Sequence, residues 1–180
     1  MFKDFDISGF KNMKPPGDNT FDTSQELKAL AKIPLKKDFV KKFDNIEAAF
    51  AKTAKDNNVE DYDKKIASKL IKTSAPVILK LKKHFDRPRP KVLAKKINIK
   101  MKDIEMESMK TPSYPSGHSA QGILIAKVLG HKYPKAKSAF AKTGENISYS
   151  RNVAHAHYKS DSKMGEKLGN AMYKHIKNKI

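Results

Sequence analysis

The segment Ser150–Asp161, SRNVAHAHYKSD, holds the pattern from which the rest of the chain is best interpreted. Five residues separate Arg151 from His157, and three separate His157 from Asp161. A carboxylate four positions after a histidine can face the same side of a helix and hydrogen-bond one ring nitrogen, which is how hydrolases orient a reactive histidine. A His–Asp pair on a helix surface without any chemical role has the same spacing. This segment alone leaves both interpretations open.

Two shorter patterns precede it. Residues 115–118 read PSGH, and an Arg89-Pro90 pair follows Lys82 by seven positions. Twenty-four residues separate these two patterns, and 31 separate the second from Ser150. Each has an ordinary structural interpretation, because Pro-Ser-Gly is a common turn and lysine is frequent throughout the chain. The patterns become informative about function because they occur together and in this order.

Taken together, the three patterns resemble the signature of the type 2 phosphatidic acid phosphatase and vanadium haloperoxidase superfamily. The resemblance spans Lys82–Asp161 directly. The early Pro15-Pro16 stretch and the helix expected after it are also similar to the soluble bacterial class A acid phosphatases. The resemblance implies a metal-independent phosphatase that hydrolyses phosphate monoesters or pyrophosphates through a phosphohistidine intermediate. It also implies an all-α fold, a compact single-domain helical bundle of the acid phosphatase and haloperoxidase type.

The resemblance assigns a role to each motif residue. His157 is the expected nucleophile, Asp161 would hold its second ring nitrogen, and His118 is the expected general acid. Five residues are expected to bind the phosphate: Lys82, Arg89, Ser116, Gly117 and Arg151. The transition state of phosphoryl transfer spreads charge over three equatorial oxygens, so fixed cations can replace Mg²⁺, and a glycine admits a backbone N–H close to an oxygen. The sequence has no carboxylate cluster near these motifs suited to Mg²⁺. We therefore expect no metal and no cofactor, with vanadate as an inhibitor.

The basic residues support this interpretation. Of 38 lysines and arginines only three are arginines, at positions 87, 89 and 151, and all three lie within the motifs. A guanidinium offers a rigid fork of donors that matches two phosphate oxygens, which lysine does not. The lysines are spread evenly along the chain, so the net charge of +19 predicts a solvating surface and no specific nucleic-acid site. A weak attraction to anionic membrane surfaces is expected.

The remaining sequence predicts one helical domain. Residues 1–22 are expected to form an extended N-terminal arm, and residues 23–180 a single helical phosphatase domain. Thr23 to Glu26 matches a capping box, and apolar residues recur at helical spacing over 38–54. No signal peptide or membrane-spanning segment is recognisable, and the chain has no cysteine, so we expect a soluble protein located in the cytoplasm.

Two other functions remain open at this point. The same phosphate cradle could hold vanadate in a vanadium-dependent haloperoxidase, although such enzymes are generally much longer than 180 residues. The chain could also be a basic protein that binds nucleic acid or anionic membranes and keeps a vestigial pocket. The substrate is expected to be a phosphorylated small molecule or lipid, and neither its identity nor the oligomeric state can be predicted.

Overall fold

The computed structural model describes residues 1–180 and contains helices and no strand, which confirms the expected all-α fold. The α-helices are α1 (Ser8–Lys11), α2 (Phe21–Ala31), α3 (Lys37–Asp44), α4 (Ile46–Asp56), α5 (Lys65–Phe85), α6 (Pro90–Lys96), α7 (Gly117–Lys132), α8 (Lys137–Val153) and α9 (Lys159–Ile176). Three short 3₁₀ helices are η1 (Glu107–Lys110), η2 (Pro134–Ala136) and η3 (Lys177–Lys179). None of the helices combines the length and the apolar character needed to cross a bilayer.

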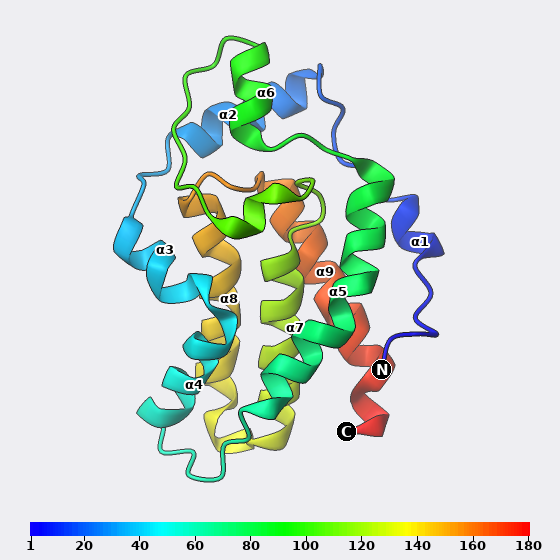
Figure 1. The fold of residues 1–180 in the computed structure, drawn as a ribbon, viewed down its shortest axis with the longest axis vertical. Coiled ribbons are helices and arrows are strands. Elements are labelled where there is room, and N and C mark those ends of the chain that lie inside the picture. Colours follow the sequence, from blue (N-terminus) through cyan, green and yellow to red (C-terminus); the bar gives the residue numbers. More distant parts are fainter.

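Helix α7 is the central element of the bundle. Figure 1 shows it between α8, α9 and α5, with α2 and α6 together at the end where α7 begins. Leu124, Ile125 and Leu129 on α7 are fully buried and belong to a core of 24 buried residues. A helix that is apolar on several faces is typical of a core position. The surrounding helices α3, α4, α5, α8 and α9 contribute most of the other core residues.

Small residues let α9 lie directly on α7. A Cβ added at Gly165 would overlap the carbonyl oxygen of Ser116 and lie 2.8 Å from Cβ of Ser119. A Cβ added at Gly169, one turn later, would overlap the carbonyl oxygen of Ala120. Any side chain at these positions would therefore push the two helices apart. The close contact matters because the N-termini of α7 and α9 both carry predicted site residues.

Two expectations about local structure were wrong. The helix expected over 38–54 is interrupted at Asn45, where the side-chain Oδ1 accepts a hydrogen bond from Ala48 N at 2.9 Å and starts α4. The expected capping box at Thr23 is also absent: Thr20 caps α2 instead. Asparagine and threonine are both favoured caps, and the capping interaction outweighs an unbroken apolar pattern at Asn45.

The first 22 residues are not uniformly extended. They include the single turn α1, and the side chain of Phe2 is buried in the core with an exposed fraction of 4%. Further along, α5 continues through Pro76 and changes direction along its length (Figure 1). A proline inside a helix removes one backbone hydrogen bond and bends the axis. The last turn of α5 thereby reaches the end of the bundle at which α7 begins.

Candidate active site

The ends of five helices bring the predicted site residues together. Lys82 is in the last turn of α5, Arg89 is the residue before α6, and Arg151 is in the last turn of α8. Ser116 caps α7 and Asp161 lies in the first turn of α9. His157 lies in the short connection between α8 and α9, and Gly117 and His118 begin α7.

His157 and Asp161 form the pair that their spacing predicts. Nδ1 of His157 lies 3.1 Å from Oδ2 of Asp161, and both side chains are almost completely buried. Asp161 also accepts hydrogen bonds from the backbone N–H of Tyr158, from the Ser113 hydroxyl and from Arg87. Burial raises the pKa of Asp161, while Arg87 and the hydrogen bonds oppose that rise. Since every partner donates, the side chain is held as an acceptor, which is the form required to orient the histidine.

The partner of the second ring nitrogen defines the tautomer of His157. Nε2 lies 2.9 Å from Nη1 of Arg89. A guanidinium can only donate hydrogen bonds, so Nε2 is the unprotonated nitrogen that accepts from Arg89, and Nδ1 carries the proton. Burial, followed by the charges of Arg89 and Lys82, holds the pKa of His157 well below its usual value. The ring is neutral and Nε2 faces the cations, as a nucleophile toward phosphorus requires.

Protein acceptors occupy the three cations that were expected to bind phosphate. Arg89 donates to the carbonyl oxygens of Thr111, Ser108 and Ala156 at 2.9, 2.9 and 3.0 Å. Arg151 donates to Oδ1 of Asp44 and to the hydroxyl of Ser108, both at 2.9 Å, and its buried Nε has no partner. Lys82 donates to the carbonyl oxygen of Pro112. An anion that binds here must therefore replace some of these acceptors.

Burial lowers the pKa of all three cations, that of Arg151 included. It lowers the pKa of Lys82 to about 7, and the neighbouring charge of Arg89 adds to the effect. It also lowers the pKa of Arg89 to about 10. The cost arises because a charged group in an apolar surrounding loses hydration. A bound oxyanion would offset that cost. The buried cations are therefore more stable with an anion bound between them than without one.

The start of α7 supplies the remaining donors. Ser116 Oγ accepts a hydrogen bond from Ser119 N at 3.2 Å, and Ser116 N donates to the backbone oxygen of Asp161 at 3.0 Å. A Cβ at Gly117 would lie 3.8 Å from Cε of Lys82 and 3.5 Å from Cγ2 of Ile78, an ordinary contact. The contacts between protein atoms around Gly117 therefore do not require a glycine. The free N–H groups at the beginning of a helix favour an anion.

His118 lies at the edge of the cluster, beside the end of α3. Its Nε2 is 2.9 Å from the backbone oxygen of Asp44 and 3.7 Å from Oδ1 of the same residue. Burial and the charge of Arg151 lower the pKa of His118 to about 4. A general acid must be protonated, so His118 can serve in that role only in acid or when a bound phosphate raises its pKa.

Several residues in this network were not predicted. Asp44 contacts both Arg151 and His118, and it is brought there by the break between α3 and α4 at Asn45. Arg87 pairs with Asp161, and its Nη1 lies 2.8 Å from Oδ1 of that carboxylate. Glu26 binds the backbone N–H of Ser160 at 2.8 Å and also contacts Arg87. No motif marks these partners, since each pairing joins segments far apart in the sequence.

The ring of His155, two positions before His157, forms its hydrogen bonds outside the cluster. It has a left-handed φ of 56°, and its two ring nitrogens each lie 2.7 Å from a carbonyl oxygen, one of Lys102 and one of Ile33. It therefore fixes the α8–α9 connection to two neighbouring segments. The connection is held in place on one side of His157 by this ring and on the other by Asp161.

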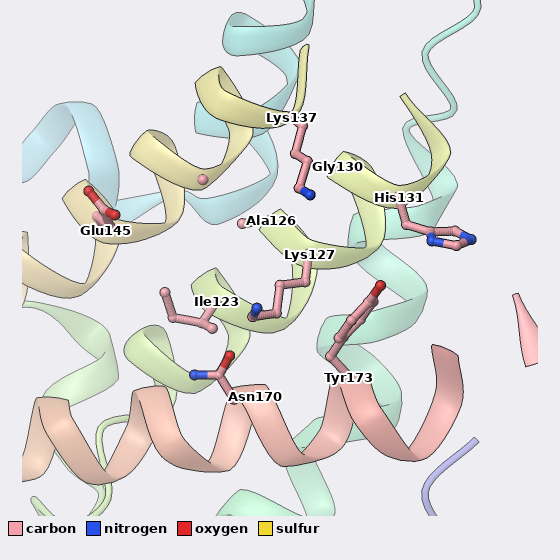
Figure 2. A pocket seen from close by; sticks show the side chains of 10 residues that line it. Ile123, Ala126, Lys127, Gly130, His131, Lys137, Glu145, Asn170 and Tyr173 are labelled. Atoms are coloured by element: carbon pink, nitrogen blue, oxygen red, sulfur yellow. The ribbon is translucent and has the colours of Figure 1, made fainter. Parts of the chain in front are cut away.

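Other hollows lie on the surface. A groove of about 360 Å³ between α7, α8 and α9 is lined by Lys127, Lys137, Glu145, Asn170 and other residues (Figure 2), none of which is a predicted site residue. A hollow of about 710 Å³ borders the cluster at Arg89. No three histidine, aspartate or glutamate side chains are grouped so that they could hold a metal ion.

Comparison with known proteins agrees with the motif geometry. The family model described as the PAP2 superfamily matches residues 66–177. The chain belongs to the PAP2 superfamily. The match covers α5 to α9, the helices whose ends carry the site, so the family expected from the three motifs is confirmed.

Individual relatives of this PAP2 protein fall into two groups. Proteins named non-specific acid phosphatase from Salmonella typhimurium and Salmonella typhi are 38% and 36% identical over 88 residues, which is 49% of this chain and 35% of each relative. The chain thus matches about a third of the length of these relatives. A crystal structure of a transmembrane PAP2-type phosphatidylglycerolphosphate phosphatase from Bacillus subtilis has a TM-score of 0.61 at 18% identity, covering 99% of this chain and 96% of that one. This likeness shows the shared fold.

Proposed function

We propose that this PAP2 protein is a phosphatase that hydrolyses phosphate monoesters or pyrophosphates through a phosphohistidine at His157, without a metal ion. The observation that carries the proposal is the pair of contacts made by the imidazole. Nδ1 faces the Asp161 carboxylate at 3.1 Å, and Nε2 lies 2.9 Å from Nη1 of Arg89. The charges of Lys82 and Arg151 also act on this ring. Support for hydrolysis also comes from the partial similarity to proteins named non-specific acid phosphatase.

The proposed reaction has two steps. A phosphoryl oxygen first takes over the Arg89 donor that contacts Nε2, and Nε2 then attacks phosphorus while the bond to the ester oxygen breaks. His118, protonated beside the bound anion, gives its proton to the departing oxygen. In the second step water attacks the phosphohistidine, its proton returns to His118, and the N–P bond breaks to release phosphate. Lys82, Arg89, Arg151 and the N–H groups at the start of α7 stabilise the equatorial oxygens in both steps.

The two alternative functions remain predictions. A vanadium-dependent haloperoxidase would use Lys82, Arg89 and Arg151 to hold vanadate, because these donors can serve either oxyanion. Vanadate-dependent oxidation of bromide by peroxide would favour that alternative. A basic binding protein with a vestigial pocket would bind polyanions without any turnover.

The first experiment is hydrolysis of a chromogenic aryl phosphate from about pH 4 to 9 in the presence of EDTA, with wild-type protein and His157→Ala. We expect wild-type activity in EDTA and none in the variant. Denaturation in alkali during turnover, followed by peptide mass analysis, should find the phosphoryl group on His157. Activity in His157→Ala, or a requirement for added Mg²⁺, would contradict the proposal.

A further inference from the structure

Glu26 contacts the start of α9 from a different helix. It lies on α2, at the end of the bundle at which α7 begins (Figure 1) and outside residues 66–177, which match the family. Its Oε1 accepts a hydrogen bond from the backbone N–H of Ser160 at 2.8 Å, and its Oε2 accepts one from the Ser160 hydroxyl at 2.7 Å. The first N–H groups of a helix have no partner within the helix, and a carboxylate is favoured beside them. Glu26 therefore caps α9 and holds its first turn, in which Asp161 is the next residue.

The same carboxylate also holds Arg87. Oε2 of Glu26 lies 3.3 Å from Nη2 of Arg87. Nη1 of that guanidinium donates to Oδ1 of Asp161 and to the Ser160 hydroxyl, both at 2.8 Å, and its Cζ lies 3.6 Å from the centre of the Tyr158 ring. Two carboxylates, a hydroxyl and an aromatic face thus surround Arg87, whose side chain is 1% exposed. Its position depends on both carboxylates, because a buried guanidinium needs acceptors for its donors.

The contact with Arg87 determines which oxygen of Asp161 faces the proposed nucleophile. Arg87 binds Oδ1, so Oδ2 is the oxygen that lies 3.1 Å from Nδ1 of His157. A carboxylate that is bound at one oxygen cannot rotate about its Cβ–Cγ bond without breaking that contact. Two of the supports of Asp161, the first turn of α9 and Arg87, are therefore held by one side chain, that of Glu26.

Helix α2 is itself fixed beside the start of α9. Leu27, the neighbour of Glu26, is fully buried in a cluster with Leu93, Ala94 and Tyr158. Tyr158 is the residue immediately before α9. Buried apolar contacts as well as hydrogen bonds thus set the distance between α2 and the first turn of α9. A side chain that extends from such a packed element can hold a site residue in a defined position.

We propose that Glu26 is a positioning residue of the phosphatase, which places the Asp161 carboxylate for its contact with His157. It acts through Ser160 and Arg87. The inference rests on the proposed function, because it assumes that His157 attacks phosphorus. It deepens that function by adding α2 to the elements that the reaction requires. Glu26 forms no hydrogen bond with the cations that bind phosphate, so it acts on phosphoryl transfer and leaves phosphate affinity unchanged.

The test compares kcat for an aryl phosphate with the Kd for inorganic phosphate, measured by titration calorimetry, in Glu26→Ala. We expect kcat to fall about 10- to 100-fold, because a small displacement of a catalytic group has an effect of this size. We expect the Kd to change less than about threefold, since Lys82, Arg89 and Arg151 keep their charges and the effect of the lost carboxylate is screened. A variant that merely loosened the fold would impair both quantities.

Two matched variants separate position from charge and from folding. Asp22→Asn, at an exposed side chain one turn earlier on α2, also removes a negative charge, and we expect it to leave kcat and Kd unchanged. Glu26→Gln keeps the length of the side chain and an oxygen for the Ser160 N–H, but its amide presents donors to Arg87. We expect its kcat to lie between those of wild type and Glu26→Ala, with the Kd unchanged. Glu26→Gln also decides the test if Glu26→Ala fails to fold.

A proton NMR signal reports on the contact between His157 and Asp161 without turnover. The Nδ1–H of His157 is buried and faces a carboxylate, so it should give a resonance far downfield, assigned by its loss in His157→Ala. We expect this resonance to shift or broaden in Glu26→Ala. In Asp22→Asn it should stay as in wild type.

The outcomes are distinguishable. A kcat in Glu26→Ala and Glu26→Gln equal to that of Asp22→Asn, or a Kd that weakens in proportion to kcat, would overturn the role of Glu26 and leave the phosphatase intact. So would an unchanged Nδ1–H resonance in Glu26→Ala. Wild-type protein that neither binds phosphate nor hydrolyses the aryl ester would overturn the proposed function and this inference together.

Discussion

At the scale of single residues, Arg151 shows why an arginine is needed where the chain otherwise uses lysine. Its two terminal nitrogens contact separate acceptors, Asp44 and Ser108, and its buried Nε remains unpaired. A lysine would keep the charge and lose the fork. We expect Arg151→Lys to lower kcat/KM for an aryl phosphate about a hundredfold, as the loss of one transition-state donor does. Lys127→Arg, in the groove of Figure 2, is the control. Near-normal turnover in Arg151→Lys would show that the paired donors of the guanidinium are not needed.

The two lowered pKa values next to the cradle predict the pH dependence of kcat/KM. His118 must be protonated to act as an acid, and its pKa in the free protein is about 4. Lys82 must be charged to attract the substrate, and its pKa is about 7. Protons are lost as pH rises, so kcat/KM should fall above about pH 4 and more steeply above about pH 7. Lys82→Arg, which stays charged, should lack the second decline on the same substrate. A rate that rises between pH 5 and 8, roughly, would contradict both assignments.

How far the sequence predicts this site depends on which residues carry a recognisable pattern. The eight motif residues could be named because the signature specifies their type and spacing, and the structure brings them into one cluster. Asp44 could not be named, because it is placed by the helix break at Asn45 and pairs with Arg151 more than a hundred positions later. The available signal was Asn45 itself, a favoured N-cap residue. The Glu26–Ser160 contact was missed for a related reason, since the expected capping box gave that glutamate a local partner.

At the scale of elements, the contact between α7 and α9 sets the distance from Ser116 to Asp161. We expect Gly165→Ala to destabilise the protein by about 1–3 kcal/mol and to lower kcat/KM, because the added methyl group would overlap the Ser116 carbonyl. Gly169→Ala makes a similar overlap one turn from the site and should lose comparable stability with a smaller loss of activity. Urea unfolding and steady-state kinetics measure the two effects.

Gly9→Ala is the control for that comparison, since an added Cβ there meets nothing within 4 Å. It should leave both stability and turnover close to wild type. If Gly165→Ala behaved like Gly9→Ala, the close approach of α9 to α7 would not be what holds the site together.

At the scale of the whole molecule, His118 and His157 couple folding to pH. The pKa of His118 is lowered to about 4 and that of His157 is also lowered in the folded protein. Between about pH 6.5 and 4 the unfolded chain therefore binds more protons than the native state, and the free energy of unfolding falls as pH falls. His118 alone accounts for up to about 3 kcal/mol. Urea titrations at several pH values should show this slope, and His118→Gln should reduce it. An equal slope in His118→Gln would show that other groups cause the acid sensitivity.

The segment Met106–Ser113, which includes η1, is attached to the cluster by its carbonyl and hydroxyl oxygens. Lys82, Arg89 and Arg151 all donate to acceptors within it, and these are the donors that an incoming phosphate requires. Phosphate binding would therefore remove hydrogen bonds that hold this segment in place. In a deuterium-exchange experiment, added phosphate should slow the exchange of amides at the start of α7 and accelerate it across Met106–Ser113. The start of α7 would become more rigid when the anion binds, and residues 106–113 would become more mobile. After each release of product, this segment would have to form its hydrogen bonds to the three cations again.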